Sequence, residues 1–125
     1  MLVIREEQWD AFVRASLASL QERVLAKARV DWRGEAEEMG ADVFAARVRD
    51  AVQRAVQYGL STDRAASDFV DLTFIWSDDF DVSHTTPWAE PILKADLDGA
   101  AKLTALLRRS ERALEERIAG TARRA

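Results

Sequence analysis

The stretch Ser61-Thr-Asp-Arg-Ala-Ala-Ser-Asp-Phe-Val-Asp-Leu-Thr-Phe-Ile-Trp76 is the most hydrophobic part of the chain, and it decides the fold class. Apolar side chains fill six of its last eight positions, whereas Asp68 and Asp71 lie on the remaining face. So short an apolar run suits a buried strand as well as a buried helix. The adjacent Ala65-Ala66 pair and the helical periodicity on both sides favour the helix. We therefore expect a helix at the centre of the core, with a strand over residues 69–76 as the competing interpretation.

The segments before this stretch repeat their apolar residues at helical spacing. A long amphipathic helix is predicted over residues 6–30 and a second helix over residues 41–58. The apolar stripe of the first helix comprises Trp9, Phe12, Val13, Leu17, Leu20, Val24 and Leu25. Gly34 is expected to close this helix in the left-handed conformation that often ends helices, before a polar link over residues 35–40.

Residues at the helix ends set the next boundaries. Tyr58-Gly59 supplies a helix stop of the same glycine type. Ser61 or Thr62 then caps the central helix, because a hydroxyl there can accept a hydrogen bond from an N–H of the first turn. Residues 77–86 show no period and predict a structured loop.

Two prolines shape the segment after this loop. Thr86 as N-cap and Pro87 as first helical residue predict a helix start, since the missing N–H of proline has no cost there. Pro91 lies beyond the first turn of this predicted helix. Proline disturbs the helix there, because it cannot donate the hydrogen bond of a helix interior. The helix is therefore expected to be short or bent.

A last long helix is predicted over residues 100–118, with Gly120 as its end and residues 121–125 as a frayed basic tail. The connections between the predicted helices are short enough for antiparallel neighbours. The sequence therefore predicts an all-α fold, a compact bundle of four to five helices with long first and last helices, in a single domain over residues 1–125. Long amphipathic helices also suit a dimer interface, so a homo-oligomer stays open.

Composition limits the class of protein. The chain of 125 residues is 48% hydrophobic and 32% charged, a balance that predicts a folded domain and excludes a disordered chain of low hydrophobicity. Cysteine is absent, which excludes disulfides and thiolate chemistry. No apolar run approaches the roughly 20 residues that span a bilayer, and the start lacks the basic and apolar regions of a secretory signal. We expect a cytoplasmic protein that does not enter the membrane.

Charge is distributed unevenly along the chain. Residues 61–98 carry two basic and nine acidic side chains, a net charge of −7, whereas residues 99–125 carry seven basic and three acidic ones, a net charge of +4. Such asymmetry can steer a charged partner, or it can let the two segments pack against each other. Ordinary solvated faces are the plainer explanation.

The sequence offers little to catalysis. It has one histidine, no cysteine, no glycine-rich phosphate loop and no nucleophile motif, so no catalytic residue and no cofactor is predicted, and we expect a protein that is not an enzyme. Asp78, Asp79, Asp81 and His84 are the one group of metal-binding residue types, but their spacing lacks the glycine and the closing glutamate of a calcium loop. A small metal-assisted hydrolase built on these four residues is kept as an alternative, and no metal site is predicted.

A protein contact is the favoured use of the same loop. Trp88 follows the acidic residues beside a proline turn, and an exposed tryptophan next to charge is a frequent interface anchor. The predicted partner-binding residues are Asp78, Asp79, Phe80, Asp81, His84 and Trp88. The alternative is a capped loop whose Phe80 and Trp88 are buried in the bundle.

The last helix suggests a second alternative, a nucleic-acid-binding regulator. It carries Arg108, Arg109, Arg112, Arg117, Arg123 and Arg124. Glu111, Glu115 and Glu116 lie at spacings that allow ion pairs within the helix, so its net charge is modest. The acidic pI near 5.1 and the lack of a nucleic-acid-binding motif make nucleic acid the less favoured partner.

Three short motifs carry a resemblance to a known group. They are Val3-Ile4-Arg5-x-Glu7-Gln8, then Tyr58-Gly59-Leu60-Ser61, then Asp79-Phe80-Asp81 followed by Pro87-Trp88-Ala89 and Ile92-Leu93. Together they resemble small helical bacterial proteins encoded near type VI secretion and polymorphic-toxin effector genes. The resemblance spans residues 3–93 and implies an adaptor, chaperone or immunity-type partner of a secreted effector or secretion component. It supplies no catalytic residues.

Overall fold

A computed structural model describes residues 6–124 of the chain and the side chains of residues 7–121. The helices, in chain order, are α1 (Glu6–Asp31), α2 (Arg33–Met39), α3 (Ala41–Gln57), α4 (Asp63–Ile75), α5 (Ala89–Leu93) and α6 (Gly99–Arg124). No strand occurs within these residues. The predicted all-α fold with long first and last helices is confirmed, with six helices where four to five were expected.

The central position of α4 follows from its apolar faces. Ala66 and Phe69 are fully buried, and α4 contacts α1, α3 and α6. Its N-terminus is capped as predicted, because the Thr62 hydroxyl accepts a 3.1 Å hydrogen bond from the N–H of Ala65. The helix is therefore confirmed as the core element, and the competing strand over residues 69–76 is wrong.

The core lies where α1, α3 and α4 meet. Each of these helices places small and branched residues on its inner face, and the fully buried ones include Leu25, Val48, Ala51, Val52, Ala55, Ala66 and Phe69. Burying one large aliphatic or aromatic side chain contributes about 1.5–3 kcal/mol. The small alanines let the helix axes approach closely, which is why the three helices pack on one another directly.

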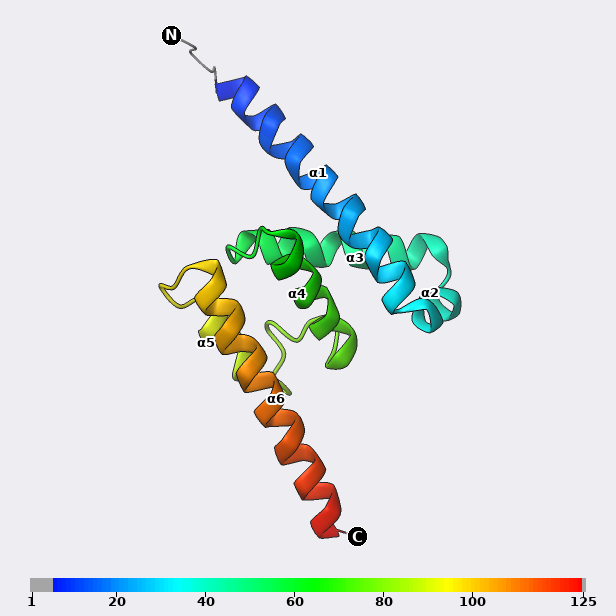
Figure 1. The fold of residues 1–125 in the computed structure, drawn as a ribbon, viewed down its shortest axis with the longest axis vertical. Coiled ribbons are helices and arrows are strands. Elements are labelled where there is room, and N and C mark those ends of the chain that lie inside the picture. The colour runs from blue at the N-terminus through cyan, green and yellow to red at the C-terminus, as the bar shows by residue number, and fades with distance from the viewer. Residues whose placement is uncertain (1–5, 125) are drawn as a thin grey trace.

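Both long helices extend beyond this core (Figure 1). The first buried residue of α1 is Leu20, so only its C-terminal half packs on the bundle, while the half before Leu20 projects outward. In α6, Leu106 and Ser110 are buried, and the C-terminal end of the helix runs away from the body to the opposite end of the molecule. The two ends of the described chain therefore lie far apart along its longest axis.

The expected polar link after the first helix is wrong, because residues 33–39 form α2. Gly34 lies within this helix and has a negative φ, whereas Gly40, which follows it, has a φ of +89°. Arg33 and Glu37 lie four residues apart and form an ion pair, which supports the extra turn. The left-handed glycine that ends this part of the chain is therefore Gly40 and not Gly34.

Two boundaries near the C-terminus also differ from expectation. Thr86 does not cap a helix, because its hydroxyl donates a 2.6 Å hydrogen bond to the carbonyl of Phe80, and α5 begins only at Ala89. Gly120 does not end α6, because its φ is not positive and the helix continues to Arg124. The predicted frayed tail is therefore helical over residues 121–124, and Ala125 lies outside the described residues.

Candidate functional site

The predicted contact loop is partly folded into the bundle. The ring of Phe80 is fully buried and packs on the ring of Phe69, with centroids 5.1 Å apart. The side chain of Asp81 is also buried, with 2% of the residue exposed. These two residues do not form a contact surface, which corrects the prediction that included them. Asp78, Asp79 and His84 are exposed.

Arginines of α3 neutralise the acidic residues of the loop. Arg54 donates from Nη1 to Oδ1 of Asp81 at 2.6 Å and from Nη2 to the carbonyl of Asp78 at 2.8 Å. Nε of Arg47 lies 3.5 Å from Oδ1 of the same Asp78. The negative charges of Asp78 and Asp81 are therefore both compensated by arginines. The sequence alone does not reveal the two contacts of Arg54, because they join residues that lie 27 and 24 positions apart in the chain.

Tyr58 completes this network from the C-cap of α3. Its hydroxyl donates a 2.8 Å hydrogen bond to Oδ2 of Asp81. Burial raises the pKa of Tyr58 to about 12, and the hydrogen bond to Asp81 and the negative charges of Asp81 and Glu90 act in the same direction. Both carboxylate oxygens of Asp81 are thus occupied, and the network holds the loop in place rather than leaving groups for chemistry.

The metal-assisted alternative finds no support in this arrangement. Within the described residues, no group of three or more His, Asp or Glu side chains is placed to hold a metal ion. Asp81 points into the bundle toward Arg54, while His84 is exposed. A metal ion would have to displace an arginine from a buried carboxylate, which is unfavourable because the cation would be left unpaired.

An open groove lies beside Trp88, where the end of the loop meets α6. Trp88 packs edge-on against Trp76, with ring centroids 5.6 Å apart, and Nε1 of Trp76 donates a 2.9 Å hydrogen bond to the Ser110 hydroxyl. The guanidinium of Arg109 lies over the Trp88 ring at 5.7 Å. The groove has a volume of about 580 Å³ and is lined by Trp76, Thr85, Thr86, Pro87, Trp88, Arg109, Ala113, Glu116 and Arg117.

The α6 wall of this groove is charged. Arg109, Ala113 and Arg117 recur every four residues, which places them on one face of the helix. Nη1 of Arg109 is buried and has no hydrogen-bond acceptor among the described residues, since the nearest carboxylate oxygen, on Glu116, is 3.9 Å away. A buried donor without an acceptor is unfavourable by about 1–3 kcal/mol, so the Arg109 side chain is incompletely satisfied in this arrangement.

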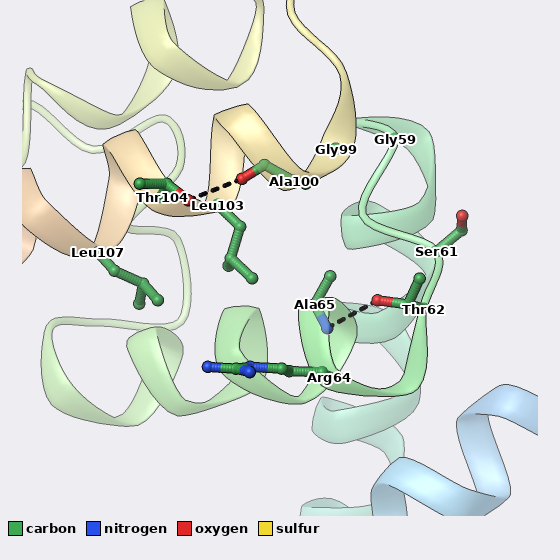
Figure 2. Close-up of a pocket in the computed structure, with 10 residues that line it drawn as sticks. All are labelled: Gly59, Ser61, Thr62, Arg64, Ala65, Gly99, Ala100, Leu103, Thr104 and Leu107. Carbon is green, nitrogen blue, oxygen red and sulfur yellow. Dashed lines mark hydrogen bonds between the residues drawn. The ribbon is translucent and has the colours of Figure 1, made fainter.

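Figure 2 shows a second cleft, where the first turns of α4 and α6 meet. Two of its hydroxyls are already used by the helix backbones, because Thr62 caps α4 and the Thr104 hydroxyl donates to the carbonyl of Ala100. Leu103 and Leu107 form its apolar wall, and Arg64 is its one charged side chain. Without an acid, a base or a nucleophile in position, this cleft of about 370 Å³ offers packing surface rather than chemistry.

The projecting half of α1 exposes a group of large apolar side chains. Trp9, Phe12 and Val13 are 54%, 63% and 46% exposed. The rings of Trp9 and Phe12 stack with centroids 5.8 Å apart. A shallow groove of about 280 Å³ continues from Phe12 and Val13 to Leu20 and to Val56 of α3. Exposed apolar patches of this kind mark association surfaces.

The basic face expected on the last helix is diluted by acidic neighbours. Glu116 forms ion pairs with Arg112, at 3.5 Å, and with Arg109, at 3.9 Å. Arg108 and Arg112 share the opposite surface with Glu111 and Glu115. The side chains of Arg123 and Arg124 lie outside the described residues. The described part of α6 therefore lacks the continuous positive stripe typical of a nucleic-acid-binding helix.

No helix among the described residues has the length and hydrophobicity that a membrane crossing needs.

Comparison with known proteins adds no evidence about the site. The motif Val3-Ile4-Arg5 lies outside the described residues, whereas Tyr58-Gly59-Leu60-Ser61 forms the predicted turn between α3 and α4. No protein-family model, no curated protein and no solved structure matches this chain.

Proposed function

We propose that this chain is a non-catalytic, cytoplasmic accessory protein that binds another protein through the groove between Trp88 and α6. The observation that carries the proposal is the pairing of an aromatic floor, Trp76 and Trp88, with an arginine wall, Arg109 and Arg117. Tryptophan and arginine are the residues most enriched among the energetically dominant positions of protein interfaces. This keeps Trp88 as a contact residue and replaces the acidic loop by α6 as the second half of the surface.

The groove defines the chemistry of the partner. Its apolar floor accepts an aromatic or branched side chain, which would lose water on both faces between Trp88 and Ala113. Arg109 has a buried donor without an acceptor, and Arg117 lies on the same wall. A carboxylate next to the apolar side chain would satisfy both guanidinium groups. The expected ligand is therefore a protein segment that presents an apolar side chain beside an acidic one.

The biological setting rests on the resemblance of residues 3–93 to small bacterial proteins encoded near type VI secretion and polymorphic-toxin effector genes. In that setting the partner is a secreted effector or a secretion component. The chain then acts as an adaptor, a chaperone or an immunity-type protein. These three roles share the requirement for a stoichiometric complex with one protein.

Affinity capture of the tagged chain from its native cell lysate, followed by mass spectrometry, tests the proposal when paired with matched variants. Arg117→Glu reverses the charge of the groove wall, and Ala113→Trp fills the groove. Arg108→Glu makes the same charge change on the other surface of α6. We expect the first two variants to lose at least about tenfold in affinity for the captured protein, and the control to retain it.

Thermal unfolding of each variant, followed by circular dichroism, keeps loss of binding separate from loss of structure. A partner retained equally by Arg117→Glu and Ala113→Trp, both folded, removes the groove from the proposal. Recovery of the chain with nucleic acid that nuclease removes, and with no stoichiometric protein, overturns the protein-binding function itself.

A further inference from the structure

The projecting half of α1 has an apolar face that the described residues leave largely exposed. Trp9, Phe12 and Val13 lie at helical spacings of three and four residues and are all about half exposed or more. The same stripe continues into Leu20 and Val24, which are buried against the bundle. The helix therefore carries one continuous apolar face, whose outer part from Trp9 to Val13, a little more than one turn, is exposed.

An unsupported helical arm needs packing to stay ordered. Isolated helices of fewer than about 12–15 residues are marginal in water, because nucleation is unfavourable and few hydrogen bonds follow it. The exposed part of α1 before Leu20 is of this length. A partner for its apolar face would supply the packing that the rest of the bundle supplies to the C-terminal half.

We propose that the partner is a second copy of this chain, and that the two α1 arms pack antiparallel about a two-fold axis near Phe12 and Val13. In this register Trp9 of each copy lies opposite Ser16 of the other. The large ring thus faces the small Ser16, which has Ala15, Ala18 and Ser19 nearby in the sequence and lies where the shallow groove lined by Ser16, Leu20 and Val56 begins. Such alternation of large and small side chains lets two helices interdigitate.

Charge selects the antiparallel orientation. Asp10 and Arg14 are four residues apart and flank the same side of the apolar stripe. Antiparallel pairing places Asp10 of each copy near Arg14 of the other, which makes two ion pairs related by the two-fold axis. Parallel pairing, with the two-fold axis along the helices, would place Asp10 and Arg14 of the two copies on opposite flanks of the interface, so neither ion pair would form. The arm is therefore self-complementary in charge as well as in shape.

This surface is separate from the groove at Trp88. The α1 arm projects from one end of the molecule and the groove lies on α6, and no contact joins α1 to α6. Dimerisation and binding of the other protein are therefore expected to be independent. A dimer would present two copies of the groove to its partner.

Engineered disulfides give a direct test, because the chain has no native cysteine. Val13→Cys places a thiol near the two-fold axis, whereas Ala11→Cys places one at nearly the same height on the opposite, exposed side of α1. Under mild oxidation of the full chain we expect Val13→Cys to form a covalent dimer at least about tenfold faster than Ala11→Cys. Equal rates for the two variants would overturn the proposal.

Sedimentation equilibrium of the unmodified chain and of arm variants provides the second measurement. We expect concentration-dependent dimerisation, weakened at least about tenfold by Phe12→Ala. Asp10→Arg alone should also weaken it, and Asp10→Arg combined with Arg14→Asp in the same chain should restore it. A chain that stays monomeric at all concentrations refutes the dimer. The dimer is equally refuted when the chain stays monomeric and its arm binds a different protein. Failure of rescue by the double variant refutes the antiparallel register.

Discussion

The hydroxyl of Tyr58 donates a 2.8 Å hydrogen bond to Oδ2 of Asp81, and this bond fastens the loop after α4 to the end of α3. The other carboxylate oxygen of Asp81 accepts a 2.6 Å hydrogen bond from Arg54. Because Asp81 is buried, these two donors supply the hydrogen bonds that water would otherwise make to its carboxylate. The loop is therefore positioned by one buried carboxylate, and the Trp88 groove depends on that position.

Asp81→Ala should destabilise the fold by about 2–3 kcal/mol, because it removes the counter-charge of a partly buried arginine and leaves a tyrosine hydroxyl unpaired. Asp79→Ala is the matched control, because Asp79 is exposed. Among the described residues, its carboxylate accepts a hydrogen bond only from the nearby Ser77 hydroxyl. This control should change stability by no more than about 0.5 kcal/mol. Urea denaturation measures both values. Similar effects for the two variants would show that the buried network is not what holds the loop.

The ionisation of Tyr58 should make stability fall at high pH. Its pKa is raised from 10.0 to about 12 in the folded protein, so the folded state binds the phenolic proton more tightly than the unfolded state. The associated stabilisation is fully present below pH 10 and is lost as the pH rises through 12. Tyr58 is the single tyrosine of the chain, so the ultraviolet absorbance of its phenolate reports this titration directly.

A Tyr58→Phe variant serves as the control for that measurement. Its denaturation midpoint should lack the decline that the unmodified protein shows between pH 10 and 12. In an otherwise unmodified chain, Asp81→Asn should lower the pKa of Tyr58, because it removes a negative charge that disfavours the phenolate. An unaltered titration in Asp81→Asn would contradict the contact.

Gly40→Ala and Gly34→Ala should change stability in opposite directions. Gly40 has a φ of +89°, a conformation that alanine adopts at a cost of about 1 kcal/mol. Gly34 lies inside α2 with open space around its Cα, so alanine there should stabilise the protein by about 0.5–1 kcal/mol. Thermal unfolding of the pair measures the difference. The reverse order would mean that the first helical region ends at Gly34.

Gly99→Ala tests the close approach of α6 to the turn after α3. A Cβ at Gly99 would lie 2.5 Å from the carbonyl oxygen of Gly59, so one backbone segment must move. We expect a loss of about 1–3 kcal/mol, together with greater solvent access to the cleft of Figure 2. Gly120→Ala is the control, because Gly120 is helical and a Cβ there would meet no described atom within 4 Å. It should be neutral or stabilising when measured by the same denaturation.

Local signals accounted for much of the fold. The spacing of apolar residues predicted α1, α3, α4 and α6, and the Thr62 cap was anticipated from its hydroxyl alone. Both are short-range effects, because helix periodicity and capping depend on residues within a few positions of one another. The polar character of residues 33–39 misled the prediction of a link, since Ala36 and Met39 are the only residues of this short helix that pack on the core among those described, too few for a clear apolar stripe.

The candidate site was only partly predictable for a different reason. Trp88 was predicted to be a contact residue, but Arg109 lies 21 positions further along the chain, and nothing local joins the two. Likewise, Asp81 looks like an exposed acidic residue until Arg54 and Tyr58 are seen to surround it. The regular spacing of Arg109, Ala113 and Arg117 is the one sequence signal that could have indicated a shared helix face.

By itself the sequence determined that the chain is helical, that α4 lies in the core, and that α1 carries an apolar stripe along its whole length. Those properties depend on residue type and period, which neighbouring positions supply. Only the tertiary structure decided which acidic residues are neutralised, where the groove forms, and which part of the α1 stripe stays exposed. Burial and ion pairing depend on residues that are distant along the chain and meet only when the helices pack.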